Sequence, residues 1–191
     1  MTTPQADDVT VVVLAGGASR RFGSDKLAAP LGGSTVLDHL VAGLPAAWPV
    51  VAVGAARPTG REVAWTREDP PGGGPLAAVE AGLDLVRTGI LVVVAGDMPF
   101  AGEVVGTLVD ALHEADPEVV AAVGTDEDGV PNPLLAAYRS DAVREGLPRP
   151  AHGRPARSLL RLPHVEVALT ARAVRDVDTP ADLEDLDGSQ P

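Results

Sequence analysis

The sequence contains no cysteine, and aromatic residues make up only 3% of its 191 residues. The lack of cysteine excludes disulfides, a thiol nucleophile and thiolate metal sites. With so few aromatic side chains, the core must be built from valine, leucine and alanine. The longest apolar runs have the length of strands, and none is long enough to span a bilayer as a helix.

Positive charge is also scarce, since the chain has a single lysine, Lys26, and a formal net charge of −12. This balance argues against nucleic acid or an anionic membrane as a partner. No basic segment followed by an apolar stretch opens the sequence, so we see no secretory signal and expect a cytoplasmic protein.

Apolar, strand-like runs alternate with helical segments along the chain. We predict strands at residues 9–14, 49–54, 90–95, 118–123 and 134–138, a weaker one at 62–66, and an edge or antiparallel strand at 164–169. We predict helices at 35–44, 75–87, 103–114 and 140–146, an irregular segment at 147–158, and a strand followed by a proline-initiated helix within 174–186. A single domain is expected over 1–187, with a frayed tail at 188–191.

This alternation predicts an α/β fold of the Rossmann-like, three-layer kind, with a mostly parallel central sheet and helices on both faces. Ligands of such sheets lie over the carboxyl ends of the strands. Three stretches are therefore expected on one rim of the sheet: residues 15–26, 67–74 and 96–99.

The first of these stretches lies in VVVLAGGASRRFGSDKLAAPLGG, residues 11–33. It supplies neither the G-x-G-x-x-G dinucleotide fingerprint nor the G-x-x-x-x-G-K-[ST] phosphate loop. Small residues at 15–17 nevertheless allow backbone N–H groups to approach a ligand closely, and Arg20, Arg21 and Lys26 concentrate positive charge beside them. We predict a phosphate-bearing ligand here; the alternative is a strand turn with solvated charges.

Asp97 comes two residues after the predicted strand 90–95 and suits Mg²⁺, which is held by carboxylates together with substrate phosphates. The alternative is that it caps the following turn. Asp178 is a candidate second metal ligand, or a helix cap before Thr179. Ser19 and Ser24 have no base partner, and the histidines have no metal-ligand spacing, so neither covalent catalysis nor a histidine metal site is predicted.

With these elements placed, the segment LAGGASRRFGSDKLAAPLGGSTVLDHL resembles the nucleotidyltransferase pattern L-A-G-G-x-x-x-R-[MF]-G…K. The segments EDPPGGGPLAAV, GDMPF, PNPLLAAY and DVDTPADL follow in the order found in the molybdenum cofactor guanylyltransferase family. The resemblance covers residues 9–186.

The resemblance implies a role for several residues. Main-chain contacts to the nucleotide would come from Leu14, Ala15, Gly16 and Gly17, with the base and ribose near residues 72–74 and Asp69 beside the nucleoside. The triphosphate would be gripped by Arg21 and Lys26, and Mg²⁺ would be bound by Asp97. Arg154 and Arg157 would face the phosphate of the acceptor.

The reaction that the resemblance implies is Mg²⁺-dependent transfer of GMP from GTP to the phosphate of molybdopterin, with release of pyrophosphate. Catalysis would rest on alignment and charge neutralisation by Arg21, Lys26 and Asp97. Its partners would be GTP and molybdopterin, and molybdoenzyme-maturation proteins are a further candidate.

The chain departs from the family pattern in two places. It has Gly54, Ala55 and Ala56 where some members have an asparagine near the nucleoside, and it has Asp176 and Asp178 where many carry N-x-N-T-P. Both changes concern the choice of base, so a cytidylyltransferase acting on the same pterin stays open. A transferase acting on a sugar phosphate or another small phosphorylated acceptor is a further alternative. A non-catalytic cofactor carrier with the same fold is an alternative of a different class.

Overall fold

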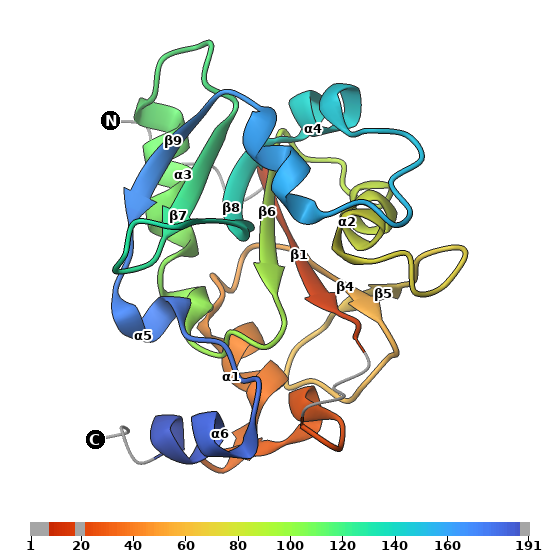
Figure 1. Cartoon of the computed structure of the whole chain (residues 1–191), viewed down its shortest axis with the longest axis vertical. Coiled ribbons are helices and arrows are strands. Elements are labelled where there is room, and N and C mark those ends of the chain that lie inside the picture. Colours follow the sequence, from red (N-terminus) through yellow and green to blue (C-terminus); the bar gives the residue numbers. More distant parts are fainter. Residues whose placement is uncertain (1–7, 18–21, 188–191) are drawn as a thin grey trace.

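A mixed β-sheet runs through the centre of the computed structural model, which describes residues 8–17 and 22–187. Within this part of the chain the sheet has seven strands in the order β5-β4-β1-β6-β8-β7-β9 (Figure 1). The strands are β1 (Val9–Ala15), β4 (Val50–Gly54), β5 (Ala64–Thr66), β6 (Ile90–Ala95), β7 (Ala121–Thr125), β8 (Pro131–Arg139) and β9 (His164–Ala168). A small antiparallel pair, β2 (Pro30–Leu31) and β3 (Ser34–Thr35), lies apart from this sheet.

Helices connect the strands. The α-helices are α1 (Val36–Gly43), α2 (Pro75–Leu83), α3 (Val105–Glu114), α4 (Ser140–Gly146), α5 (Ala171–Val174) and α6 (Pro180–Asp187). The 3₁₀ helices are η2 (Lys26–Ala28), η3 (Ala101–Glu103) and η4 (Ala156–Arg161). Helix α1 begins one residue later than predicted, because Thr35 is its N-cap and its side chain accepts a hydrogen bond from the Asp38 N–H.

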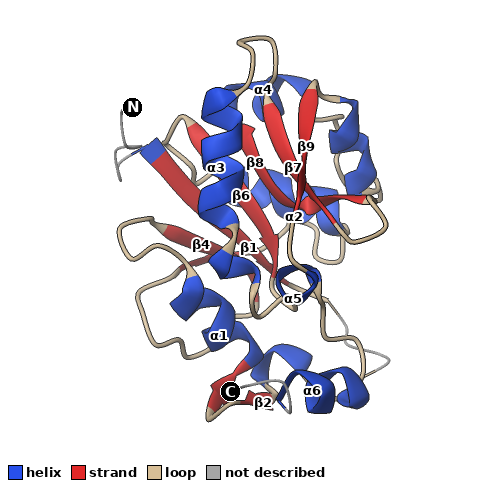
Figure 2. Cartoon of the chain, turned by 90° about the vertical axis from the view of Figure 1, so that its left-hand side faces the viewer, coloured by secondary structure: helices blue, strands red, loops and turns tan. Residues whose placement is uncertain are grey.

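The core consists of two apolar layers, one on each face of the sheet, because successive side chains of a strand point to opposite faces. Val11 and Val13 pack in the layer that includes α1 and α3, whereas Val12 packs in the layer that includes α2 and α4. Figure 2 shows α3 in front of the sheet, α2 behind it and α1 below the strands. All three valines are fully buried, which explains why β1 reads as a continuous apolar run rather than an alternating one.

The predicted α/β fold with a mostly parallel sheet is confirmed. β1 is parallel to β4 and β6, and β4 is parallel to β5. β8 is the exception, because it is antiparallel to both β6 and β7. β9 lies at the edge as predicted, although it pairs with β7 in parallel.

Two predicted elements need correction. The strand expected in 174–178 is wrong: α5 ends at Val174 and the chain then crosses the end of β6, where the Val177 N–H donates to the Asp97 carbonyl at 2.9 Å. A segment that crosses the end of a strand forms a single backbone hydrogen bond there, whereas a paired strand would form a series of them. The helix predicted at 75–87 ends earlier, at Leu83. The expected tail, 188–191, lies outside the described residues.

None of the described helices is long and apolar enough to cross a membrane.

Candidate active site

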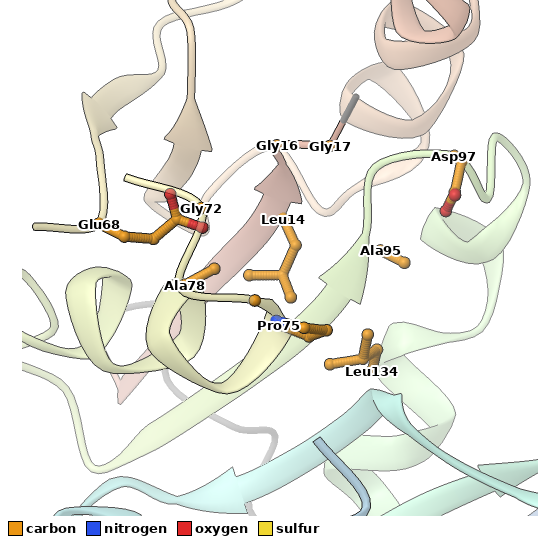
Figure 3. A pocket seen from close by; sticks show the side chains of 11 residues that line it. Leu14, Gly16, Gly17, Glu68, Gly72, Pro75, Ala78, Ala95, Asp97 and Leu134 are labelled. Atoms are coloured by element: carbon orange, nitrogen blue, oxygen red, sulfur yellow. The ribbon is translucent and has the colours of Figure 1, made fainter. Parts of the chain in front are cut away.

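A cavity of about 550 Å³ opens over the carboxyl ends of β1 and β6, within the usual size range of small-molecule sites. All three stretches predicted to share one rim of the sheet contribute to its walls, together with residues of β1, β6, α2 and β8. The lining residues are Leu14, Gly16, Gly17, Glu68, Gly72, Gly74, Pro75, Ala78, Ala95, Asp97 and Leu134. Figure 3 shows Glu68 and Asp97 on opposite sides of the cavity, with Leu14 between them.

Bare backbone at the ends of the strands shapes this cavity. Gly54 ends β4 opposite Ala15, and a Cβ at this position would lie 2.4 Å from the Ala15 carbonyl oxygen. Gly74 has a φ of +86° directly before Pro75, the first residue of α2. Only glycine adopts such a backbone without strain, and proline is favoured at the first position of a helix. The glycines directly before α2 therefore contribute backbone rather than side chains to this wall of the cavity.

The sole lysine lies next to two carboxylates from distant parts of the chain. Lys26 Nζ donates to Asp97 Oδ2 at 2.6 Å and to Asp178 Oδ1 at 3.0 Å. The Lys26 side chain is 16% exposed and that of Asp97 is 22% exposed. Burial alone would lower the pKa of Lys26, but its hydrogen bonds to the two carboxylates outweigh this effect and raise the pKa. Lys26 is therefore held as an ammonium ion.

A third carboxylate joins this group. Asp97, Asp176 and Asp178 each offer a carboxylate oxygen, and these oxygens lie within 4.8 Å of one another. Partial burial of its carboxyl group, together with the negative charges of Asp97 and Asp178, raises the pKa of Asp176 although the residue as a whole is exposed. The cluster thus concentrates more negative charge than one ammonium ion neutralises.

Local structure holds the carboxylates in place. On one side of Asp178, the neighbouring Val177 is buried and its N–H donates a hydrogen bond to the Asp97 carbonyl. On the other side, Asp182 Oδ2 accepts from the N–H groups of Asp178 and Thr179 at 3.1 and 2.7 Å. Thr179 and Asp182 thus satisfy the backbone at the start of α6, while the side chain of Asp178 contacts Lys26.

Arg57 connects the loop after β4 to the segment that carries Lys26. Its guanidinium donates to both carboxylate oxygens of Asp25, at 2.7 and 3.0 Å, and to the Ala15 carbonyl at 3.1 Å. The hydrogen bond from Arg57 lowers the pKa of Asp25. Asp25 in turn accepts from the Leu27 N–H at the start of η2, so Arg57 supports the position of Lys26 from outside the cavity.

The structure brings some of the predicted site residues together and separates others. Leu14, Gly16, Gly17 and Asp97 line the cavity, and Lys26 contacts Asp97. Ala15 is fully buried beneath them. Arg21, like Arg20, lies outside the described residues.

Three other predicted residues do not line the cavity. Asp69 is exposed and lines a separate cavity of about 330 Å³. Arg154 and Arg157 are exposed and line neither cavity. Their segment nevertheless touches the glycine loop, because the Gly153 N–H donates to the Gly73 carbonyl at 2.7 Å.

Sequence reasoning missed Glu68, Asp176 and Arg57 as site residues. The D-x-D spacing of Asp176 and Asp178 was a usable signal, because it places two carboxylates on one short segment. Glu68 was adjacent to the predicted Asp69. Arg57 had no distinguishing signal, since arginine is common in this chain.

The match to known families agrees with this geometry. Residues 11–170 match the MobA-like NTP transferase domain. The chain therefore belongs to the MobA-like NTP transferase family, which is a family of nucleotidyltransferases.

Two bacterial proteins and one solved structure show which nucleotidyltransferases the chain is similar to. The chain is 35% identical over 130 residues to the molybdenum cofactor guanylyltransferase of Cupriavidus metallidurans, a match that covers 64% of each chain and so just under two thirds of that protein's length. It is 35% identical over 148 residues to the probable molybdenum cofactor guanylyltransferase of Mycobacterium tuberculosis, covering 72% of this chain and 71% of that protein. In fold it is similar to the molybdopterin-guanine dinucleotide biosynthesis protein A of Archaeoglobus fulgidus, with a TM-score of 0.70 at 23% identity over 94% of this chain and 97% of the other.

Proposed function

We propose that this protein transfers GMP from GTP to the terminal phosphate of molybdopterin and releases pyrophosphate. The observation that carries the proposal is the cavity of about 550 Å³ with a glycine-lined wall and the Lys26–Asp97 pair at one end. The names of the two bacterial relatives support guanylyl transfer to this acceptor.

In this reaction an oxygen of the acceptor phosphate forms a bond to the α-phosphorus of GTP. The bond from the α-phosphorus to the bridging oxygen breaks, and its electron pair leaves with pyrophosphate. Both reactants are anions and charge builds on the leaving group, so the protein contributes positioning and electrostatic stabilisation. Backbone groups at Gly16 and Gly17 hold the nucleotide, and the ammonium of Lys26 stabilises the charge on the departing pyrophosphate.

Asp97 and Asp178, together with Asp176, have a donor set that fits Mg²⁺, an ion that prefers oxygen ligands and is bound through carboxylates and substrate phosphates. When bound, the ion would neutralise negative charge on the phosphate oxygens. Lys26 contacts Asp97 and Asp178, so it would release them when the ion and the triphosphate arrive, and the phosphates would then be its new anionic partners.

The test is to incubate the protein with Mg²⁺, molybdopterin and each of GTP, CTP, ATP and UTP, and to identify products by mass while following pyrophosphate. The proposal predicts a guanine dinucleotide of the pterin and turnover with GTP. A cytosine dinucleotide would replace guanylyl by cytidylyl transfer. Nucleotide binding without any product would instead favour the non-catalytic carrier.

A matched variant tests the role of the lysine. Lys26→Arg keeps the positive charge but replaces a compact ammonium with a wide, planar group, and it is expected to lose most turnover while folding normally. Thermal unfolding measures the fold independently of activity. An equally active Lys26→Arg enzyme would contradict the proposed role of Lys26.

A further inference from the structure

Glu68 places a carboxylate in the cavity at the side opposite Asp97 (Figure 3). It follows β5 by two residues and is half-buried. Glu68 borders both the main cavity and the second one, whereas its neighbours Arg67 and Asp69 line only the second. Arg67 Nε donates to the Gly54 carbonyl at 3.3 Å. Glu68 is thus the acidic residue of this loop that reaches the main cavity.

Within residues 8–17 and 22–187, no side chain or backbone N–H forms a hydrogen bond or ion pair with Glu68. The side chains that share its cavity are mostly apolar, among them Leu14, Pro75 and Leu134. A half-buried carboxylate among such neighbours is stabilised by a ligand that supplies hydrogen-bond donors.

We propose that Glu68 selects guanine, accepting hydrogen bonds from the N1–H and the exocyclic N2 amino group of the base. The inference rests on the proposed function, because it assigns one end of the same cavity to the base. The phosphates would then extend toward Lys26 and Asp97 at the other end, with the apolar side chains against the faces of the base.

The hydrogen-bonding edges of the four bases explain the choice. Guanine presents two adjacent donors on this edge, which match the two oxygens of a carboxylate in a bidentate arrangement. Cytosine and adenine place a ring-nitrogen acceptor beside their amino donor, so one carboxylate oxygen would face a lone pair. Uracil offers a single N–H between two carbonyl oxygens. Glu68 therefore both attracts guanine and repels the alternatives.

Calorimetry with Mg²⁺ and no acceptor tests this without any substitution, by comparing GTP with ITP, whose base lacks only the N2 amino group. Since a hydrogen bond to a charged group contributes about a 10- to 100-fold change in affinity, GTP is expected to bind the wild-type protein at least about tenfold more tightly than ITP. Equal affinities for GTP and ITP would overturn the proposal.

Two variants then test whether the preference for GTP over ITP comes from Glu68. Glu68→Gln replaces one acceptor oxygen with a donor, and it is expected to weaken GTP binding about tenfold or more and to bring the GTP-to-ITP ratio close to one. Glu80→Gln changes another half-buried glutamate, which lines only the second cavity, and should preserve the ratio. A ratio unchanged in Glu68→Gln, or lost in Asp69→Asn instead, would overturn the proposal.

The outcomes separate this inference from the proposed function. If wild-type protein binds GTP and produces the guanine dinucleotide but Glu68→Gln behaves like the wild type, only the role of Glu68 fails. If the wild type prefers CTP, both the role of Glu68 and guanylyl transfer fail. If no nucleoside triphosphate binds, the assignment of the cavity itself is wrong.

Discussion

Replacing Lys26 with methionine is expected to tighten the binding of a divalent cation in the absence of nucleotide. Lys26 Nζ lies 2.6 Å from Asp97 and 3.0 Å from Asp178, both of which are candidate metal ligands. A cation that uses these oxygens must displace the ammonium and overcome its repulsion. Methionine removes the charge and keeps an unbranched, flexible side chain of similar length.

The size of this effect follows from the exposure of the ion pairs. Two unit charges 4 Å apart attract by about 4 kcal/mol at an effective dielectric constant of about 20. The Asp178 side chain is 44% exposed, so solvent weakens its attraction to Lys26. We take about 1–3 kcal/mol as the net free energy by which the Lys26 ammonium opposes cation binding at the two carboxylates. Lys26→Met should therefore bind a divalent cation about 5- to 150-fold more tightly.

Mn²⁺ provides the assay, because electron paramagnetic resonance measures the free ion directly during a titration of the apoprotein. The double variant Lys26→Met/Asp97→Asn serves as the control and should lose most of the gain. With GTP present, Lys26→Met should instead bind its ligand more weakly than the wild type. The ammonium is then expected to contact phosphate, so its loss weakens binding of the nucleotide. Unchanged or weaker Mn²⁺ binding by Lys26→Met would refute the reasoning.

Three further changes test the site and its support. Asp97→Ala is expected to abolish pyrophosphate release at any practical Mg²⁺ concentration, because it removes the carboxylate at the end of the cavity; activity recovered by added Mg²⁺ would place the metal elsewhere. The pKa of Asp25 is lowered below 3.8 by its hydrogen bond from Arg57, so the pair stabilises the fold above that value, and the contribution is lost as pH falls through the folded-state pKa. The Asp25 side chain is 44% exposed, so solvent weakens the pair, and Asp25→Asn should lower the free energy of unfolding by only about 0.5 kcal/mol at neutral pH. The variant should match the wild type well below pH 3.8, as measured by denaturant unfolding; a constant difference would contradict the assignment. Gly54→Ala should cost about 1–3 kcal/mol in the same assay, because its Cβ would meet the Ala15 carbonyl oxygen at 2.4 Å, and an unaffected variant would show that this strand end moves freely.

Several features of the fold were predictable because they depend on neighbours in the chain. Continuous valine runs indicate strands buried on both faces, and β1 and β6 are found there. Thr35 caps α1 and Pro75 opens α2, as their local chemistry predicts. The strand predicted near Asp176 failed because a short apolar and acidic pattern does not reveal whether the segment pairs along a strand or crosses its end.

The sequence by itself determined the class of fold and the rim of the sheet that carries the cavity, since periodicity and the order of strands and helices suffice for both. Only the tertiary structure decided which side chains meet there. Lys26 and Asp178 are 152 positions apart yet joined by a hydrogen bond, and Glu68 rather than Asp69 lines the main cavity. The physical reason is that side-chain direction in a loop depends on an irregular backbone, held by long-range contacts that no local period encodes.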